Sequence, residues 1–316
     1  MEVFTRYEGN PILTVKDIPY PANSVFNAAA CVFGSQTLLL MRVEDKRGIS
    51  HLTVATSDDG VTGWRVEPGP ALEPDPVKHP EEIWGIEDPR ITRIDDLDLW
   101  AVLFTAYSRG GPLVSLATTR DFRVFERKGV VMPPEDKDAA LFPVRFGGRW
   151  AMVHRPASSV EHTGAHIWIS FSPDMKHWGD HQVLLPARKG AWWDANKIGL
   201  SPPPMETDKG WLVLYHGVRA TASGCIYRLG LALLDRQDPT RVLMRSDEWV
   251  FGPQEDYEVV GDVDKVVFPC GWVRHGDEVR LYYGAADRCI GLAFTTVGKL
   301  LSWLEEHHDR DRRAWP

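Results

Sequence analysis

The sequence predicts an all-β fold, a five-bladed β-propeller with one short C-terminal helix. Helical periodicity is nearly absent from the 316-residue chain until its end, whereas short apolar runs bounded by Gly, Pro, Asp and Asn recur throughout. These runs come in five pairs. A sheet unit that recurs about every 50 to 70 residues indicates radial repetition, and five such units fit the length of the chain.

The paired runs are expected to be neighbouring strands of five sheets. A pair of β-sandwiches is the competing fold. In chain order the pairs are Leu38–Met41 with Leu52–Thr56, Leu99–Tyr107 with Val114–Thr119, Trp150–Arg155 with His166–Ser172, Trp211–Val218 with Tyr227–Asp235, and Val279–Ala286 with Ile290–Thr295. Helix spacing is seen only at Val297, Leu300, Leu301 and Leu304, and this helix is expected to pack on the outside of the propeller.

Similar turns follow the second run of several pairs. Ser57-Asp58-Asp59-Gly60 precedes Trp64, Ser172-Pro173-Asp174 precedes Trp178, and Thr118-Thr119-Arg120-Asp121 is a weaker version. In such a turn a Ser or Asp side chain closes the backbone, and the aromatic residue that follows packs on the sheet. No linker or low-complexity segment interrupts the series, so residues 1–316 are expected to form a single domain.

Composition excludes several classes of protein. The chain is 43% hydrophobic and 25% charged, which is typical of a globular domain, and its net charge of -8 argues against nucleic-acid or anionic-membrane partners. No signal-peptide pattern and no apolar run of about 20 residues is visible, so a cytoplasmic location is expected. The 13 tryptophans are either buried structural residues or the lining of a cleft for sugar rings.

The segment Gly85–Arg90 contains the strongest candidate for catalysis. Pro89 restricts Asp88 to an extended conformation, so this carboxylate is presented rigidly, as a general acid requires. The alternative is a turn carboxylate beside a local ion pair between Glu87 and Arg90. The position of Asp88 directly before a predicted strand favours the functional interpretation.

Basic residues stand at or near the ends of apolar runs and suggest an anion site. They are Arg42, Arg155, Lys197 and His216. The guanidinium fork matches phosphate oxygens bidentately. Three alternatives remain open. Each arginine could pair with nearby carboxylates, Lys197 could be a solvated surface residue, and His216 could be a core histidine with all its hydrogen bonds satisfied within the protein.

Further polar residues are expected near a sugar. Asn27 can hydrogen-bond to hydroxyl groups, and Asp287 follows small residues that permit close approach of a ligand, although a turn aspartate is the alternative. Tyr107 ends the strand after Asp88. In a propeller such residues converge from different blades on one axial pocket. No zinc spacing, nucleophile elbow, phosphate loop or dinucleotide fingerprint is present, so neither metal nor cofactor is expected.

The motifs together resemble glycoside hydrolase family 130, which contains inverting β-mannoside phosphorylases and some β-mannosidases. The most specific matches are Gly85–Arg90, Asn196–Gly199, Gly210-Trp211 with Tyr215–Val218, and Phe268-Pro269 with Tyr282–Asp287. The resemblance implies a five-bladed propeller in which Asp88 is the general acid. It also implies that Arg42, Arg155, Lys197 and His216 bind phosphate, while Asn27 and Asp287 contact the mannosyl ring. Glu87 is expected to position the acid or to contact sugar.

The expected activity is that of a glycoside phosphorylase. Inorganic phosphate, the co-substrate, would attack β-1,2- or β-1,4-linked manno-oligosaccharides with inversion and give α-D-mannose 1-phosphate; in the resembled family the proton passes through the mannose 3-hydroxyl. An inverting glycosidase instead needs a second carboxylate to activate water. An inverting β-mannosidase is therefore the alternative, followed by a non-catalytic carbohydrate-binding propeller. A homo-oligomer is compatible with this architecture, because neighbouring subunits can close such funnels.

Overall fold

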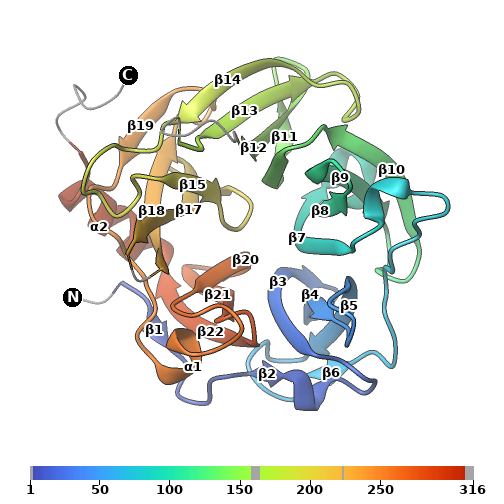
Figure 1. Cartoon of the computed structure of the whole chain (residues 1–316). Helices are drawn as coiled ribbons and strands as arrows, with labels where there is room; N and C mark the ends of the chain where they lie inside the picture. Colours follow the sequence, from blue (N-terminus) through green and yellow to red (C-terminus); the bar gives the residue numbers. More distant parts are fainter. Residues whose placement is uncertain (1–2, 158–163, 223, 310–316) are drawn as a thin grey trace.

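The computed structural model of the protein describes residues 3–157, 164–222 and 224–309. Five separate antiparallel sheets of four or five strands surround a central axis (Figure 1). The prediction of a five-bladed β-propeller is confirmed, and the alternative of two β-sandwiches is wrong. We number the blades in the order of their innermost strands.

Blades 1 to 3 are simple four-stranded meanders that run outward from the axis. Blade 1 consists of β3 (Ser24–Phe33), β4 (Gln36–Glu44), β5 (Ser50–Ser57) and β6 (Arg65–Val66). Blade 2 consists of β7 (Ile86–Ile94), β8 (Leu99–Ser108), β9 (Gly111–Thr119) and β10 (Phe125–Met132). Blade 3 consists of β11 (Asp136–Phe146), β12 (Arg149–Pro156), β13 (Ile167–Ser172) and β14 (Gly179–Leu185).

Blades 4 and 5 each contain a fifth strand. Blade 4 consists of β15 (Lys197–Leu200), β16 (Met205–Thr207), β17 (Gly210–Thr221), β18 (Gly224–Leu234) and β19 (Val242–Arg245). Blade 5 consists of β20 (Val267–His275), β21 (Glu278–Ala285), β22 (Cys289–Thr296), β1 (Thr5–Arg6) and β2 (Leu13–Thr14). The helices are α1 (Asp256–Val259) and α2 (Val297–Glu306), with 3-10 turns η1 (Val15–Asp17), η2 (Pro80–Glu82) and η3 (Asp95–Leu97).

Each predicted pair of apolar runs forms the second and third strands of one blade. The innermost strands were not part of the predicted pairs. Polar residues interrupt the apolar runs of β3, β7 and β11 near the start of each strand, and β3, β7, β11 and β20 each contain a register shift against the next strand. A β-bulge of this kind breaks the alternation that predicts a strand.

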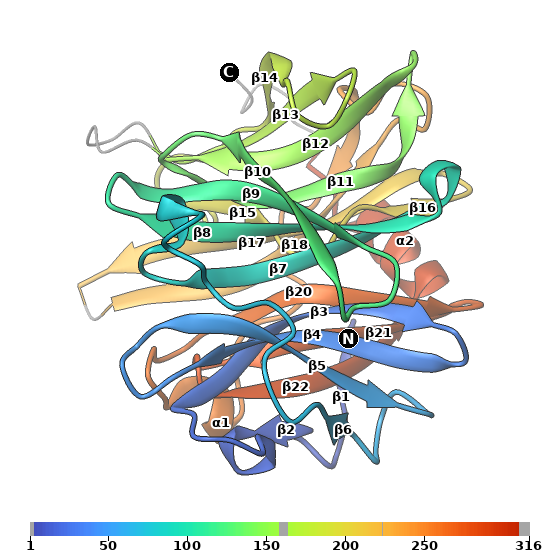
Figure 2. The same ribbon diagram turned by 90° about the vertical axis from the view of Figure 1, so that its right-hand side faces the viewer.

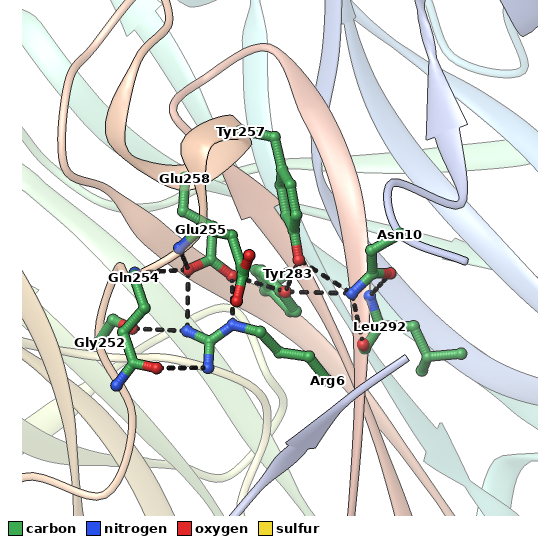
Figure 3. A network of polar contacts seen from close by, with 9 residues as sticks. All are labelled: Arg6, Asn10, Gly252, Gln254, Glu255, Tyr257, Glu258, Tyr283 and Leu292. Atoms are coloured by element: carbon green, nitrogen blue, oxygen red, sulfur yellow. Dashed lines mark hydrogen bonds and ion pairs between the residues drawn. The ribbon is translucent and has the colours of Figure 1, made fainter. Parts of the chain in front are cut away.

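The N-terminal segment closes the ring. Thr5 of β1 pairs with Phe294, and both β1 and β2 add to β22 of the last blade. A buried polar network reinforces this closure (Figure 3). Arg6 Nε donates to Glu258 Oε1 at 2.8 Å, and the Tyr283 hydroxyl donates to the same oxygen at 2.8 Å. The first strands and the last blade are therefore joined by side chains as well as by the sheet.

Apolar cores fill the spaces between adjacent blades, and α2 covers one of them from outside. Its residues Val297, Leu300, Leu301 and Leu304 are buried, which confirms the predicted helix. Thr296 caps the helix by accepting from the backbone N–H of Lys299 at 3.1 Å. The helix lies at the end of the ring opposite to the tip of the β17–β18 hairpin (Figure 2). Within the described ranges, no helix is long and apolar enough to span a bilayer.

Candidate active site

A polar pocket of about 170 Å³ lies where the innermost strands begin. All five blades or the loops that enter them contribute to its wall. The lining residues are Asn27, Arg42, Asp88, Lys137, Arg155, Lys197, His216, Tyr227, Val263, Val266, Phe268 and Asp287.

Three of the blades present an Asn or Asp to this region by the same backbone device. Asn27, Asp88 and Asp138 have φ of 46°, 49° and 55°, and each lies at the register shift of its innermost strand. The expectation that Pro89 keeps Asp88 extended is therefore wrong, because the β-bulge holds this residue in left-handed backbone. Left-handed backbone is unusual outside glycine, and Asn and Asp tolerate it best. Such strain is commonly held at functional sites. The bulges therefore aim these side chains into the centre of the ring.

Asp88 lies at the middle of an ion-pair network and is only 3% exposed. Its Oδ1 accepts from Asn27 Nδ2 at 2.8 Å and from Arg42 NH1 at 3.1 Å. Arg42 NH2 donates to Glu87 Oε1 at 2.9 Å, so this arginine is held by both carboxylates. Burial opposes ionisation of Asp88, but the charges of Arg42 and Lys137 outweigh it and lower its pKa. Burial raises the pKa of Glu87.

A second buried carboxylate, Asp138, organises the opposite wall. Its Oδ2 accepts from Arg155 Nε at 2.7 Å and lies 3.4 Å from His216 Nε2, while its Oδ1 accepts from Arg90 NH2 at 3.3 Å. Burial opposes its ionisation, but Arg155 and His216 hold the pKa of Asp138 well below its usual value. Burial lowers the pKa of His216. Asp138 therefore neutralises and orients Arg155.

Two lysines of the pocket have no such carboxylate partner. Among the described residues, neither Lys137 nor Lys197 forms an ion pair. Burial, followed by the charges of Arg155 and Lys137, lowers the pKa of Lys197. Like charges that are gathered in a desolvated pocket without counterions form a binding site for an anion.

Asp287 brings a further carboxylate to the pocket from the end of β21. Its φ is 52° and that of Ala286 is 47°, so the chain reverses sharply at this point. Burial, the largest cause, raises the pKa of Asp287 to about 6. The positive charge of Arg42 opposes this shift, and the negative charges of Asp88 and Glu87 add to it. The pocket therefore contains one carboxylate of lowered pKa and one of raised pKa.

Seven of the nine residues expected at the site line this pocket. They are Asn27, Arg42, Asp88, Arg155, Lys197, His216 and Asp287. Glu87 lies beside it, bound to Arg42. Tyr107 does not line it, but packs against Trp84 with ring centroids 6.0 Å apart.

Other residues of the site were missed in the sequence. Lys137, Tyr227 and Phe268 line the pocket, and Asp138 lies behind it. Asp138 carries a detectable signal, because it repeats the position of Asn27 and Asp88 near the start of an innermost strand. Tyr227 begins a predicted run but carries no charge, and the sequence offers no sign that it faces the pocket.

The fold and the pocket are those of a carbohydrate-active propeller enzyme, in which the carboxylates of Asp88 and Asp287 face a cluster of cations in a small axial cavity. A family model described as beta-1,4-mannooligosaccharide phosphorylase matches residues 2–306. The chain belongs to this family, glycoside hydrolase family 130. The resemblance read from the motifs is thus confirmed.

Relatives of known activity cover nearly the whole chain. A beta-1,4-mannooligosaccharide phosphorylase of Ruminococcus albus is 36% identical in an alignment of 315 positions that covers 97% of this chain and 92% of the relative. A solved beta-1,2-mannobiose phosphorylase of Listeria innocua, in complex with beta-1,2-mannobiose, matches with a TM-score of 0.87 at 30% identity and covers 96% of this chain and 99% of that chain.

The family also includes hydrolases. One solved structure belongs to work showing that this family of mannoside phosphorylases contains glycoside hydrolases. Those hydrolases target beta-1,2-mannosidic linkages in Candida mannan. The structure matches with a TM-score of 0.82 at 27% identity and covers 94% of each chain. Family membership alone therefore leaves phosphate and water as rival nucleophiles.

Proposed function

We propose that this protein is an inverting β-mannoside phosphorylase that uses inorganic phosphate to cleave β-1,4- or β-1,2-linked manno-oligosaccharides. The observation that carries the proposal is the pair of unneutralised lysines, Lys137 and Lys197, in the same pocket as Asp88. A phosphate dianion needs preorganised positive charge that holds it in line with the sugar carbon. Phosphate is already an anionic nucleophile, so no catalytic base is required.

The same charges explain how Asp88 becomes an acid. Arg42 and Lys137 lower its pKa despite burial, which favours the carboxylate. A dianion bound among the cations offsets their field, while the burial of Asp88 persists. The pKa of Asp88 then rises and its protonated form becomes available as a proton donor. Asp88 is therefore proposed as the general acid, with the product α-D-mannose 1-phosphate.

Roles for the other residues follow from position and charge. Lys197, Lys137, Arg155, His216 and Tyr227 form the wall proposed to bind phosphate. Asn27 and Asp287 are proposed to bind the mannosyl ring, since both lie on the Asp88 side of the pocket near Arg42. Glu87 and Asp138 are proposed to position the arginines that they neutralise.

Hydrolysis is the second candidate, and one observation favours it. An inverting hydrolase needs a second carboxylate about 6.5–9.5 Å from the acid to activate water. Asp287 lines the pocket with a pKa of about 6, so it is ionised at neutral pH and suits a base. This candidate leaves the two unneutralised lysines without a function.

The deciding experiment supplies β-1,4- and β-1,2-mannobiose to the purified protein with and without inorganic phosphate. Anion-exchange chromatography measures mannose and α-mannose 1-phosphate. We expect turnover only with phosphate, with mannose 1-phosphate as a product. Equal release of mannose without phosphate would establish a hydrolase.

Two variants assign the roles. Asp88→Asn should abolish turnover while its circular dichroism spectrum stays that of the parent protein. Lys197→Ala should raise the KM for phosphate far more than the KM for the mannoside, about tenfold or more for the loss of one charge-assisted contact. Equal changes in both KM values would contradict a phosphate site at Lys197.

A further inference from the structure

Trp84 and Tyr107 form an aromatic pair at the rim of blade 2, in which Trp84 is exposed and Tyr107 is half-buried. Trp84 is 47% exposed, and the centroids of the two rings lie 6.0 Å apart at an interplanar angle of 49°. Among the described tryptophans, Trp192 and Trp249 are the others that are exposed, and both line a separate surface depression on blade 4. Trp84 alone of these three immediately precedes the strand that carries Asp88.

The pair is held rigidly by the backbone. Trp84 N–H donates to the Tyr107 carbonyl and Tyr107 N–H donates to the Gly85 carbonyl, both at 3.0 Å. Gly85 has φ of 109°, and a Cβ there would lie 2.8 Å from the Ser50 nitrogen. Ser50 Oγ in turn accepts from Arg42 Nε at 2.9 Å. The aromatic surface is therefore preorganised and fixed in place relative to the pocket.

The size of the pocket places part of the substrate outside it. Sites that enclose a drug-sized ligand have volumes of roughly 300–1,000 Å³. The present pocket has about 170 Å³ and must also hold phosphate. Sugar units beyond the bond that is cleaved must therefore lie on the rim.

The direction in which those units leave is set by the chemistry. In an inverting displacement the nucleophile and the leaving group occupy opposite faces of the sugar ring. Lys197 lies on β15 and His216 on β17. Asp88 lies on β7, which is across the central axis of the propeller from these two strands (Figure 1). The leaving sugar chain is thus on the blade 2 side, and Trp84 lies at the start of that blade.

We propose that Trp84, packed on Tyr107, is a stacking subsite for the leaving-group end of an oligosaccharide, beyond the sugar next to the cleaved bond. The apolar face of a pyranose ring stacks on the indole, whose large, rigid surface binds at little cost in conformational entropy. This inference rests on the proposed function. It adds a preference for chains of at least three sugar units over the disaccharide.

The test compares kcat/KM for the di-, tri- and tetrasaccharides of the accepted linkage at saturating phosphate. For Trp84→Ala we expect the ratio of trisaccharide to disaccharide kcat/KM to fall about tenfold. Trp84→Phe, which keeps a smaller ring, should fall between Trp84→Ala and the parent. Trp249→Ala is the matched control, since it removes an exposed indole from blade 4, and its ratio should equal that of the parent.

The proposed function and the subsite are tested by different measurements. Turnover of disaccharide by the parent protein tests the proposed function, whereas the trisaccharide-to-disaccharide ratio tests the subsite. An unchanged ratio in Trp84→Ala would overturn the subsite, as would equal losses on both substrates or the same loss in Trp249→Ala. Calorimetric binding of the trisaccharide to Asp88→Asn, with and without Trp84→Ala, gives a readout independent of turnover. Equal affinities in the two proteins would likewise overturn it.

Discussion

At the scale of single residues, the pocket combines carboxylates whose environments differ sharply. Asp88 lies within hydrogen-bond distance of Asn27 and Arg42, and the neighbouring cations lower its pKa. Asp287 forms no side-chain hydrogen bond among the described residues, and burial raises its pKa to about 6. The same pocket therefore favours the charged form of one group and the neutral form of the other.

The raised pKa of Asp287 makes a prediction about stability. Between the ordinary pKa of 3.8 and the folded value of about 6, the unfolded chain has lost this proton while the folded protein retains it. The free energy of unfolding therefore decreases as pH rises through this window. Asp287→Asn should remove that decrease and stabilise the protein near neutral pH, by at most about 3 kcal/mol.

Urea denaturation at about pH 5 and about pH 7.5, in a buffer without phosphate, measures this effect. The stability gained by Asp287→Asn should be larger at the higher pH. A gain that is equal at both values, or a loss at the higher pH, would show that the Asp287 carboxylate is not destabilised by burial.

At the scale of elements, one local pattern recurs with the same bonds. The Asp59, Asp121 and Asp174 side chains each accept backbone N–H groups two and three residues ahead, at distances of 2.8–2.9 Å. The indoles of Trp64 and Trp178 then donate to a carbonyl three residues back. These turns use only nearby residues, so the sequence was sufficient to predict them.

The innermost strands show the opposite case, because their packing depends on other blades. Gly199 of β15 lies against Asp138 of blade 3 and His216 of β17, and an added Cβ would overlap both side chains. Gly199→Ala should therefore displace the residues that hold Arg155 and lower kcat/KM strongly, with a loss of stability of about 1–3 kcal/mol from overpacking.

Kinetics and thermal unfolding of Gly199→Ala test this prediction. The control is Gly69→Ala, because a Cβ at Gly69 meets no atom within 4 Å. Activity of Gly199→Ala equal to that of the control would contradict the tight contact at the centre of the ring.

At the scale of the whole molecule, an acidic protein concentrates its functional cations at the axis. The net charge is -8, yet the pocket is lined by Arg42, Lys137, Arg155 and Lys197. The closed ring makes this possible, because it brings cations from several blades into one cavity. The closure depends in turn on Arg6 and the buried Glu258, whose side chain is 0% exposed.

Arg6→Ala should therefore destabilise the whole propeller. It leaves the Glu258 carboxylate buried without its cation, and breaking a buried pair in this way costs about 3 kcal/mol. Arg65→Ala is the control, because it removes one partner of an exposed ion pair with Asp58 and should leave stability unchanged.

Chemical denaturation compares these variants with Arg6→Ala/Glu258→Gln. The double variant should recover part of the loss, because the buried group is then neutral. A loss in Arg6→Ala no greater than that in Arg65→Ala would show that the network in Figure 3 does not stabilise ring closure.

The sequence by itself determined the features that depend on local order. These are the five repeated units, the Asp-closed turns and the C-terminal helix. The extended backbone expected for Asp88 was wrong, because the β-bulge of β7 overrides the local preference that Pro89 imposes. The sequence also identified most of the charged residues of the pocket, because polar residues at the ends of apolar runs are conspicuous.

Only the tertiary structure decided which of those charges are compensated. Glu87 and Asp88 neutralise Arg42, and Asp138 of a neighbouring blade neutralises Arg155, whereas Lys137 and Lys197 lack a carboxylate among the described residues. It likewise placed Tyr107 on the rim beside Trp84 rather than in the pocket. Charge compensation depends on distances between side chains far apart in sequence. The β-bulges and the closed ring set those distances, and no local pattern encodes them.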